Sequence, residues 1–511
     1  MSQRTVIWTC LALMACLSGD MACGGDPTGG GGGGGGTDTL PPPPVGEGLS
    51  IGFVTYAGGG SEDMGRDAAT DPQGNGYLSG SAKSATFPVT QGAYDASYNG
   101  AGSYPSDAFA VKLTPAGAES WGTFLGGPEY ERAYAIEVDD QGYIYLAGRA
   151  GAGFSTTAGV LQTTFAGGNG GPEYGPQDGF ICRLTPTGAA VVFCTYFGNG
   201  DYVPIRDLAV DANHDIYIIS SDSVGGFPSG WFANAYQPAI AGGRDMLIAK
   251  VKGDGTQVLW ATYLGGTGQE ANTNSIRVDA SGVYVDGLTR SDDIPTPNGF
   301  DHTLGGPSDI YLAKLSLDGT NLLWGTYIGG SGTEDTETHQ LALDPSGNAI
   351  VVGPTSSSDL ATSGTAFQRQ FGGGGTDAMV AKVSPAGALL GLTYLGGSGG
   401  ERAEGVATDS RGNIYLTGYT TSSNLPTNLG NTFAGGQDVL FGKFSPNLSQ
   451  LLVAAVVGGS GDDRGRSIIV SPQGTVYLTG QTTSPSLPVL GALQTNFGGV
   501  IDAFVVGLDP E

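Results

Sequence analysis

Short stretches in which apolar and polar residues alternate recur along the chain from about residue 50 onward. Examples are "IYLAG", "IYIIS", "VYVDG", "IYLTG" and "VYLTG", and a period of two is typical of a half-buried β-strand. Turn sequences such as "DPSGN" and "DSRGN" separate them, where Asp can accept hydrogen bonds from its own backbone and Gly can adopt a positive φ. Helical periodicity is almost absent, so the pattern predicts an all-β protein.

The strand pattern repeats seven times. Each copy contains a short strand ending at Asp, an alternating strand, a strand from Asp to Lys, and an apolar run before Gly-Gly. Four short antiparallel strands in seven copies predict a seven-bladed β-propeller. The first glycine after the apolar run falls at Gly58, Gly126, Gly198, Gly265, Gly329, Gly396 and Gly458, where "YFGNG" replaces the doublet at Gly198.

The two ends of the repeat region predict how the ring closes. The region opens at "SIGFVTYAGG", which is a fourth strand without the first three, and ends at "DAFVVGLD", a third strand without a fourth. We therefore expect residues 50–57 to complete the last blade. This pairing would remove the exposed edges of the ring.

Residues 1–23 predict an export signal. Arg4 precedes the apolar stretch "VIWTCLALMACL", which is too short to span a bilayer. "LMAC", ending at Cys16, is similar to a bacterial lipobox, whereas "DMAC", ending at Cys23, is the alternative and has Asp20 where an apolar residue is expected. A plain signal peptide is the third possibility.

Residues 24–48, a Gly run followed by four prolines, predict a flexible linker before the propeller at 49–511. We expect an exported protein that contacts the membrane only through a lipid anchor, at the outer membrane or cell surface, or that is secreted. The closed ring is expected to be a monomer.

Composition excludes one class of partner. The chain has 511 residues, 92 of them Gly, and a net charge of −27, so nothing in it would neutralise a row of nucleic-acid phosphates. Cys182 and Cys194 flank the turn of one predicted hairpin. In an exported protein this placement predicts a disulfide, with two buried thiols as the alternative.

A pair of opposite charges recurs on the third strand of most copies. Five positions apart on a strand, the two side chains point to opposite faces and cannot contact each other. We expect each to contact an acid or carbonyl on the neighbouring blade, with ligand contact as the alternative. The pairs are Asp107/Lys112, Asp178/Arg183, Asp245/Lys250, Asp309/Lys314, Asp377/Lys382 and Asp438/Lys443.

Acidic residues follow each Gly-Gly and are expected at one mouth of the central channel. Such a ring would offer oxygen ligands to Ca²⁺; the alternative, which we favour, is a solvated rim or acids that accept from nearby backbone amides. No cofactor is otherwise expected. The candidate ligands are Glu62, Asp63, Glu270, Glu334, Asp335, Glu401, Asp462 and Asp463.

The long connections, from the second to the third strand and from the fourth strand to the next blade, share one face. Binding surfaces belong on such loops. Trp121, Trp260 and Trp324 recur at one blade position and are interpreted as packing residues. Trp231 does not recur, so it is the candidate for stacking on a partner or sugar, with a loop anchor as the alternative.

Evidence for catalysis is thin. His214, His302 and His339 occupy unrelated blade positions, and no motif pairs them with a nucleophile or a zinc-type cluster. A site built from single residues on different blades would leave no local signature.

The amino-acid sequence also resembles that of a known family. "TYLGGSGGERAEGVATDSRGNIYLTGYTTSSNLPT" at 393–427 and "DAFAVKL" at 107–113 are similar to the SBBP repeat of bacterial seven-bladed β-propellers, over about 460 residues. Ser220, Pro354 and Gly507 depart from the pattern. The resemblance implies an exported, often lipid-anchored propeller with no settled activity. We therefore expect a scaffold that binds a protein or polysaccharide through its long-loop face. The alternatives are a polymer-directed hydrolase or lyase with a site at the channel mouth, and a Ca²⁺-stabilised structural module.

Overall fold

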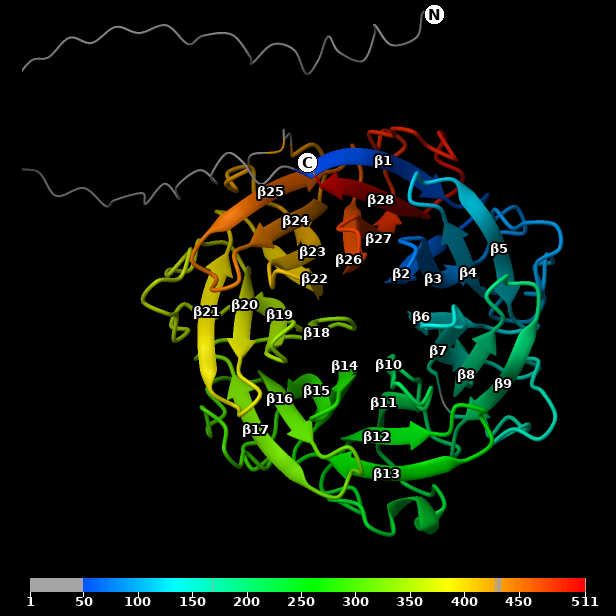
Figure 1. Cartoon of the computed structure of the whole chain (residues 1–511), viewed down its shortest axis with the longest axis horizontal. Helices are drawn as coiled ribbons and strands as arrows, with labels where there is room; N and C mark the ends of the chain where they lie inside the picture. Colours follow the sequence, from blue (N-terminus) through cyan, green and yellow to red (C-terminus); the bar gives the residue numbers. More distant parts are fainter. Residues whose placement is uncertain (1–48, 169, 428, 430–432, 511) are drawn as a thin grey trace, which may run out of the picture. The chain divides into compact units, whose positions relative to one another are not determined.

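Seven four-stranded antiparallel sheets stand in a ring around one axis (Figure 1), which confirms the predicted seven-bladed β-propeller. The computed structural model describes residues 49–510 except 169, 428 and 430–432. Cys16, Cys23 and the linker at 24–48 lie outside the described residues. Within the described residues, no helix is both long and apolar enough to cross a bilayer.

Each blade is built from four consecutive strands, numbered from the innermost outward. The first three blades contain β2 (Asp63–Thr70), β3 (Gly76–Ala82), β4 (Asp107–Leu113) and β5 (Glu119–Leu125); β6 (Arg132–Val138), β7 (Ile144–Ala150), β8 (Asp178–Leu184) and β9 (Val191–Phe197); and β10 (Asp207–Val210), β11 (Ile216–Asp222), β12 (Asp245–Val251) and β13 (Val258–Leu264). A short 3₁₀ helix, η1 (Ser229–Phe232), interrupts the long loop of blade 3.

The remaining blades follow the same plan. Blades 4 to 6 contain β14 (Glu270–Asp279), β15 (Gly282–Thr289), β16 (Asp309–Leu315) and β17 (Leu322–Ile328); β18 (Leu341–Leu343), β19 (Ala349–Thr355), β20 (Asp377–Val383) and β21 (Leu389–Leu395); and β22 (Glu401–Thr408), β23 (Ile414–Thr420), β24 (Asp438–Phe444) and β25 (Leu451–Val457). Blade 7 contains β26 (Asp463–Val470), β27 (Val476–Thr482), β28 (Asp502–Pro510) and β1 (Leu49–Ala57).

The chain's first described strand closes the ring, as predicted. β1 pairs antiparallel with β28, from Leu49 opposite Pro510 to Ala57 opposite Ala503, and the two lie side by side in Figure 1. Val54 and Tyr56 of β1 are buried in the core cluster that joins blades 6 and 7. Pairing the two ends of the chain removes the free edge of blade 7.

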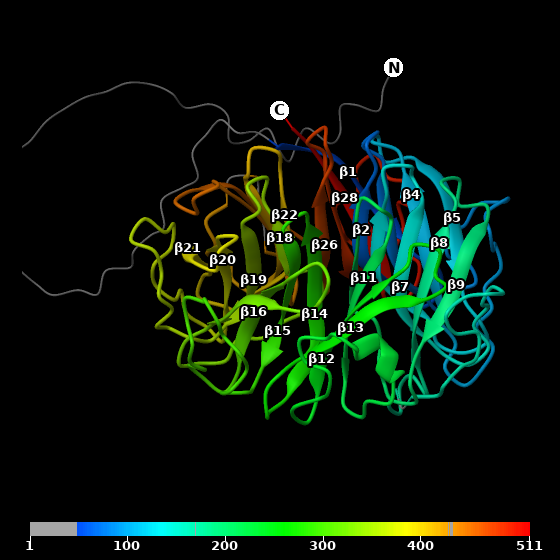
Figure 2. The same ribbon diagram turned by 60° about the horizontal axis from the view of Figure 1, so that its bottom comes forward.

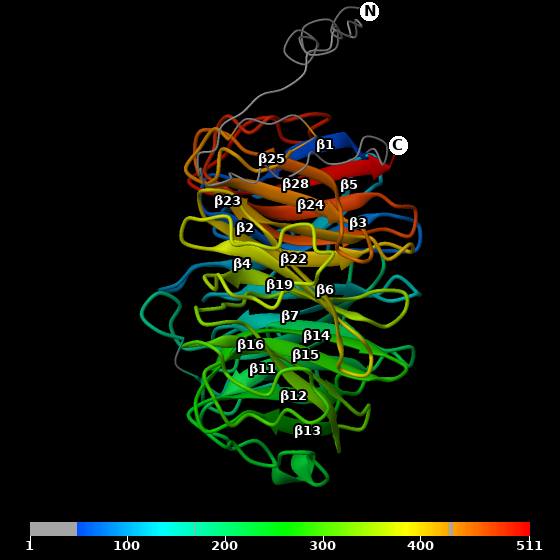
Figure 3. The same cartoon turned by 90° about the vertical axis from the view of Figure 1, so that its left-hand side faces the viewer.

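The ring has two unlike faces. Tight turns join the first strand to the second and the third to the fourth on one face. On the other face, long loops join the second strand to the third. The connections from the fourth strand to the next blade were predicted to be long as well, but most are short, as from Leu125 of β5 to Arg132 of β6. We call the two faces the turn face and the loop face; seen tilted and from the side, the strands run between them (Figures 2 and 3).

The core lies between blades, so each blade must present the same surfaces to its neighbours. Trp260 Nε1 donates to Leu317 O of the next blade at 3.1 Å, and Trp324 Nε1 donates to Pro385 O at 2.9 Å. These contacts agree with the interpretation of the recurring tryptophans as packing residues.

The recurring Gly-Gly has a steric cause. A Cβ on Gly126, the first glycine of one pair, would lie 2.4 Å from the carboxyl carbon of Asp107. A Cβ on Gly127, the second, would lie 2.7 Å from Gly153 O. Both distances are too short for a side chain, so the third-strand Asp and the adjacent long loop exclude every residue except glycine.

Candidate functional site

β-Bulges on the innermost strands direct side chains toward the propeller axis. The ladder register shifts between Gly65 and Asp67, Ala133 and Ala135, Ala403 and Gly405, and Gly465 and Ser467. A bulge adds one residue to a strand and re-aims its side chain. The extra residues here are Arg66, Tyr134, Glu404 and Arg466. They belong to four blades, yet they and their neighbours interact around the axis.

Ion pairs occupy the axis beside blades 5 to 7. Arg466 Nη1 lies 2.6 Å from Glu404 Oε2, and Arg402 Nη2 lies 2.8 Å from Asp335 Oδ2. Glu337 lies between the two arginines, at 3.7 Å from Arg466 and 3.9 Å from Arg402. Burial raises the pKa of Glu337, but Arg466 and the other nearby arginines outweigh it and lower that pKa overall. In this half of the ring, the positive charges of the arginines are therefore offset by nearby carboxylates.

The axis beside blades 1 to 3 holds four arginines that form no ion pair with a carboxylate in the described part of the chain. The guanidinium carbons of Arg206, Arg149, Arg132 and Arg66 lie 4.4, 5.5, 5.8 and 6.0 Å from the ring centre of Tyr134. In the described part of the chain, no ion pair within 4.0 Å joins any of these four arginines to a carboxylate. Cation–π contacts replace ion pairs here.

The electrostatics of these four arginines, which we call the arginine cluster, are correspondingly unusual. Burial raises the pKa of the Tyr134 phenol, but Arg149 and the other three arginines outweigh it and lower that pKa to about 6. Burial, with Arg132 and Arg466 next to it, lowers the pKa of Arg66. Both shifts show an excess of positive charge at this point of an otherwise acidic chain.

The arginine cluster lies toward the loop face. Arg132 is the first residue of β6 and Arg149 the last but one of β7, so both stand at the ends that meet the long loops. Arg149 is 2% exposed; its guanidinium lies 3.9 Å from the ring centre of Tyr174, in the long loop of blade 2, and its Nη1 donates to Tyr202 Oη at 2.8 Å.

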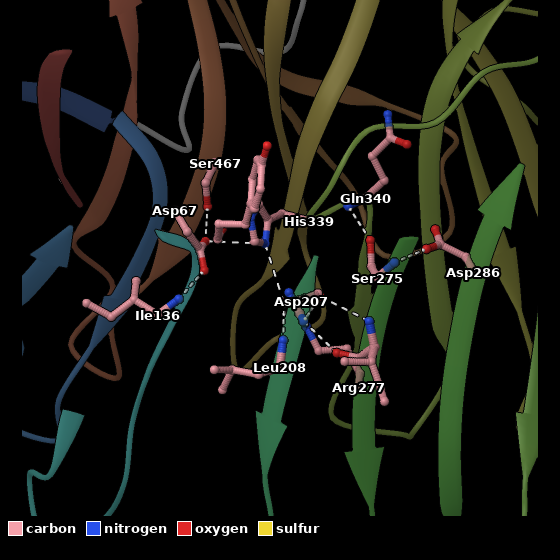
Figure 4. Close-up of polar contacts among 12 residues, drawn as sticks. Asp67, Ile136, Asp207, Leu208, Ser275, Arg277, Asp286, His339, Gln340 and Ser467 are labelled. Atoms are coloured by element: carbon pink, nitrogen blue, oxygen red, sulfur yellow. Dashed lines mark hydrogen bonds and ion pairs between the residues drawn. The ribbon is translucent and has the colours of Figure 1, made fainter. Parts of the chain in front are cut away.

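Deeper along the axis, His339 meets two carboxylates from other blades (Figure 4). His339 Nδ1 lies 3.4 Å from Asp67 Oδ1 and 3.6 Å from Asp207 Oδ1, while its Nε2 lies 2.7 Å from Tyr134 O. The histidine is 2% exposed, and its Nδ1 has no hydrogen-bond partner. We call Asp67, Asp207 and His339 the axial triad.

Neighbouring groups hold both aspartates in place. Asp67 accepts from Ile136 N at 2.8 Å and from Ser467 Oγ at 2.7 Å, so it joins blade 1 to blades 2 and 7. Asp207 accepts from Ile276 N at 3.0 Å and from Arg277 Nη1 at 2.7 Å, both in blade 4.

Two further acids, Glu137 and Asp286, lie near the triad. Burial, followed by Asp67 and Asp207, raises the pKa of Glu137 to about 7, although Arg277 opposes the shift. Burial and Asp207 raise the pKa of Asp286 to about 7 against the hydrogen bonds from Ser275. Burial and the neighbouring aspartates therefore disfavour the charged forms of both acids.

The acids predicted as Ca²⁺ ligands are spread over the blades. Asp63 accepts from Gly59 N at 2.6 Å, Glu401 from Gly397 N at 2.7 Å and Asp463 from Gly459 N at 2.7 Å. Glu270 and Glu334 accept from Ser291 Oγ and Ser357 Oγ, each at 2.6 Å. Glu62 pairs with Lys83, Asp335 pairs with Arg402, and Asp462 accepts from Thr483 through its backbone oxygen.

None of these acids belongs to a group of three ligand atoms within 4.8 Å of one another. In the described residues, such groups are the axial triad and Asp139/Asp140/His214. Binding of Ca²⁺ by the acidic loops stays a prediction.

The recurring third-strand charges form ion pairs inside blades, which differs from the prediction. Lys112 lies 3.2 Å from Asp71, Lys250 lies 2.9 Å from Asp211 and Lys382 lies 2.8 Å from Asp344. The partner acid stands in the turn that precedes the second strand. Tyr77 and Tyr217 of the second strand contact both members of the first two pairs, whereas Ile350 replaces the tyrosine in the third. Lys382 also donates to Pro446 O of the next blade at 2.8 Å.

The remaining members of the set behave similarly. Arg183 pairs with Asp139, Lys314 donates to Ser281, and Lys443 lies over Tyr415. The third-strand acids accept backbone amides of their own long loops: Asp107 from Asn99, Asp178 from Ala166, Asp245 from Ala241, Asp309 from Gly305, Asp377 from Gly372 and Asp438 from Ala434.

Cys182 and Cys194 stand directly opposite each other on β8 and β9 and form a disulfide with a Cα–Cα distance of 4.1 Å. Trp231 lies in η1, where its ring stacks on Phe227 at 5.4 Å and on Phe197 at 5.9 Å. The indole is half-buried against these rings, and a role in ligand binding stays a prediction.

Sequence reasoning missed the arginine cluster and the axial triad. Their members come from blades whose sequences are far apart, and each blade contributes a different residue. One signal was available: the segments "MGRD", "PIRD" and "THQL" carry Arg66, Arg206 and His339 at one position of the first strand, where other copies have Tyr134, Asn274 or Glu404. A polar side chain that changes from copy to copy is not explained by packing that every blade shares.

Comparison with known proteins supports the repeat. Residues 392–426 match the SBBP β-propeller repeat. Over 206 residues, 35% of this chain, the sequence is 26% identical to an uncharacterised WD repeat-containing protein of Acanthamoeba polyphaga mimivirus. The match spans 15% of that relative's length.

Three solved structures are similar to this chain at low sequence identity. A protein of unknown function from Dyadobacter fermentans is 10% identical, with a TM-score of 0.42 over 91% of this chain and 99% of its own. Quinohemoprotein alcohol dehydrogenase from Comamonas testosteroni is 9% identical (TM-score 0.40; 89% and 76% covered), and PQQ-bound aldose sugar dehydrogenase from Streptomyces coelicolor is 10% identical (TM-score 0.32; 92% and 100% covered).

Proposed function

Starting from a seven-bladed β-propeller that carries an SBBP repeat, we propose that the protein is an exported, lipid-anchored binding scaffold of the bacterial envelope. Its loop face binds an acidic polymer, either a polysaccharide or a protein segment, and one anionic group of that polymer enters the arginine cluster. The protein contributes recognition, and the anchor places it at the membrane.

The observation that carries this proposal is that, in the described part of the chain, no carboxylate forms an ion pair with Arg66, Arg132, Arg149 or Arg206. Tyr134 and Glu337 offset part of this positive charge, and Glu337 already lies beside Arg402 and Arg466. Buried charges are normally paired because desolvation is costly. The chain has 48 acidic and 21 basic residues, so acidic partners are abundant elsewhere. A cluster left unpaired in such a chain is suited to an anion from outside, since guanidinium groups bind carboxylate, phosphate and sulfate in forked geometry.

The test compares anionic and neutral probes. We expect the purified full-length protein to bind a uronate oligosaccharide or an acidic peptide, measured by fluorescence anisotropy, and not an uncharged oligosaccharide of the same length. Arg206→Gln and Arg66→Gln should each weaken binding by roughly tenfold, because each removes one charge-assisted contact.

Arg411→Gln is the matched control, because Arg411 is exposed in a turn of the turn face and its loss changes net charge equally.

Stability separates a ligand-binding role from a structural one. Arg206→Gln should raise the Tm or leave it unchanged, since it relieves repulsion between like charges, whereas Arg466→Gln should lower it by breaking the pair with Glu404. Equal binding by Arg206→Gln and the native protein would overturn the proposal.

A further inference from the structure

Three ligand atoms from three blades face one small space on the axis. His339 Nδ1 lies 3.4 Å from Asp67 Oδ1 and 3.6 Å from Asp207 Oδ1, and all three atoms lie within 4.8 Å of one another. Donor atoms bound tetrahedrally at about 2.0–2.2 Å to Zn²⁺ lie roughly 3.3–3.6 Å apart. We propose that Asp67, Asp207 and His339 bind one divalent transition-metal ion of the Zn²⁺ type.

The hydrogen bond at the far side of the imidazole prepares His339 for this role. Tyr134 O only accepts, so His339 Nε2, 2.7 Å away, carries the hydrogen and donates it. In the neutral ring, Nδ1 then presents a lone pair to the two carboxylates. Metal-binding histidines commonly donate their other N–H to a carbonyl or carboxylate, which fixes the tautomer and the ring orientation.

The buried Nδ1 atom is the observation that points to a ligand. It belongs to a side chain 2% exposed and has no hydrogen-bond partner. Two carboxylates beside a buried ring nitrogen call for one positive charge at the point where the three donor atoms converge. A proton on His339 Nδ1 would supply it by pairing with Asp67 and Asp207, and a metal ion would supply it by taking all three atoms as ligands; the metal titration distinguishes the two.

The aspartates are oriented by contacts that leave an oxygen directed at His339. Asp207 Oδ2 accepts from Arg277 and Ile276 N, while Asp207 Oδ1 accepts one hydrogen bond, from Leu208 N at 2.9 Å. Asp67 Oδ2 accepts from Ile136 N at 2.8 Å, and Asp67 Oδ1, the oxygen nearest His339, accepts from Ser467 Oγ at 2.7 Å and Ala68 N at 2.8 Å (Figure 4), so a metal ion at Oδ1 would displace the Ser467 hydroxyl. Such supporting contacts position metal ligands within a rigid frame.

Charge and ligand type select the class of ion. Asp67, Asp207, Asp286 and Glu137 bring four carboxyl groups to this part of the axis, and Arg277 Nη1 lies 2.7 Å from Asp207 Oδ2. A nitrogen with two carboxylate oxygens suits Zn²⁺, Co²⁺ or Mn²⁺, whereas Ca²⁺ takes about six to eight oxygen ligands. The proposed metal ligands lie outside the arginine cluster, so metal binding can be tested independently of polymer binding.

The experiment titrates metal-stripped full-length protein with Co²⁺ and follows the visible absorption of the bound ion. We expect about one ion per chain, displaced by Zn²⁺ and removed by a chelator. His339→Asn should bind at least roughly tenfold more weakly, because Asn tolerates the φ of 71° found at His339 but its shorter side chain cannot reach the triad.

The matched control is His214→Asn. His214 also has a positive φ, 63°, and lies 3.2 Å from Asp139, so the substitution carries the same backbone cost at the other histidine–carboxylate group. Its Co²⁺ binding should equal that of the native protein.

If His339→Asn does not fold, crystals of the native protein soaked in Zn²⁺ provide the second measurement, with an anomalous peak expected between His339 Nδ1 and the two Oδ1 atoms. No uptake of metal, retained binding in His339→Asn, or a peak beside His214 would each overturn the inference.

Discussion

At the residue scale, contacts within and between blades explain the residues that repeat along this chain. In blades 1 to 3, a turn aspartate binds the second-strand tyrosine and the third-strand basic residue: Asp71 accepts from Tyr77 Oη at 2.9 Å and lies 3.2 Å from Lys112 Nζ. The sequence predicts that these residues are structural. It does not show that the lysine pairs inside its blade, because strand alternation specifies a face and not the distance to the preceding turn.

Substitution of the first glycine of a doublet tests the steric explanation. A Cβ on Gly329 would lie 2.4 Å from the Asp309 carboxyl carbon and 2.5 Å from Glu334 Oε2, so Gly329→Ala should lower the free energy of unfolding by about 1–3 kcal/mol. The measurement is chemical denaturation at constant pH. Gly364→Ala, whose Cβ meets nothing within 4 Å, should change it by less than about 0.5 kcal/mol. Equal effects would contradict close packing around the doublet.

At the element scale, the innermost strands carry both the regularity and the exceptions. Their ladders pair as the alternating pattern predicts, but bulges insert Arg66, Tyr134, Glu404 and Arg466 toward the axis. Bulges depend on how two strands pair, so the pattern of apolar and polar residues does not predict them. The prediction for the third-strand lysines and Arg183 was incomplete for a similar reason. The acid that pairs with each of them depends on how the turns pack against the strands.

Removal of β1 tests ring closure. A form that starts at residue 58 lacks the strand that pairs with β28 and buries Val54 and Tyr56, so β28 becomes an exposed edge. We expect this form to aggregate or to melt well below a form that starts at residue 49, as measured by size-exclusion chromatography and thermal circular dichroism. A synthetic peptide of residues 49–57 should restore the Tm. Equal behaviour of the two forms would show that β1 is dispensable.

At the scale of the whole molecule, acids buried where blades meet make stability depend on pH. Burial raises the pKa of Asp107, Glu131, Glu270, Asp309, Asp377 and Asp502 to between about 6 and about 8. For Asp309, the neighbouring Glu334 adds to the shift. Each acid binds its proton more tightly in the folded chain than in the unfolded chain, so its contribution is complete at low pH and is lost as pH rises through the folded pKa.

We therefore expect the Tm to rise as the pH falls from about 8 to about 5. The measurement is a series of thermal melts at constant, high ionic strength, which screens surface repulsion but hardly affects buried groups. Asp309→Asn mimics the protonated carboxyl beside Glu334, so it should flatten the slope and raise the Tm at the alkaline end relative to the native protein. A Tm that falls toward pH 5, or an unchanged slope in Asp309→Asn, would contradict this assignment.

The amino-acid sequence by itself determined the number of blades, the order of their strands, the closing strand and the face that carries the long loops. These features depend on local periodicity and on a spacing that repeats along the chain. Only the tertiary structure decided what stands at the axis. Arg66, Tyr134 and Arg206, like Asp67, Asp207 and His339, come from different blades and meet because the ring closes. Their proximity is a property of circular geometry, which no segment of the sequence contains.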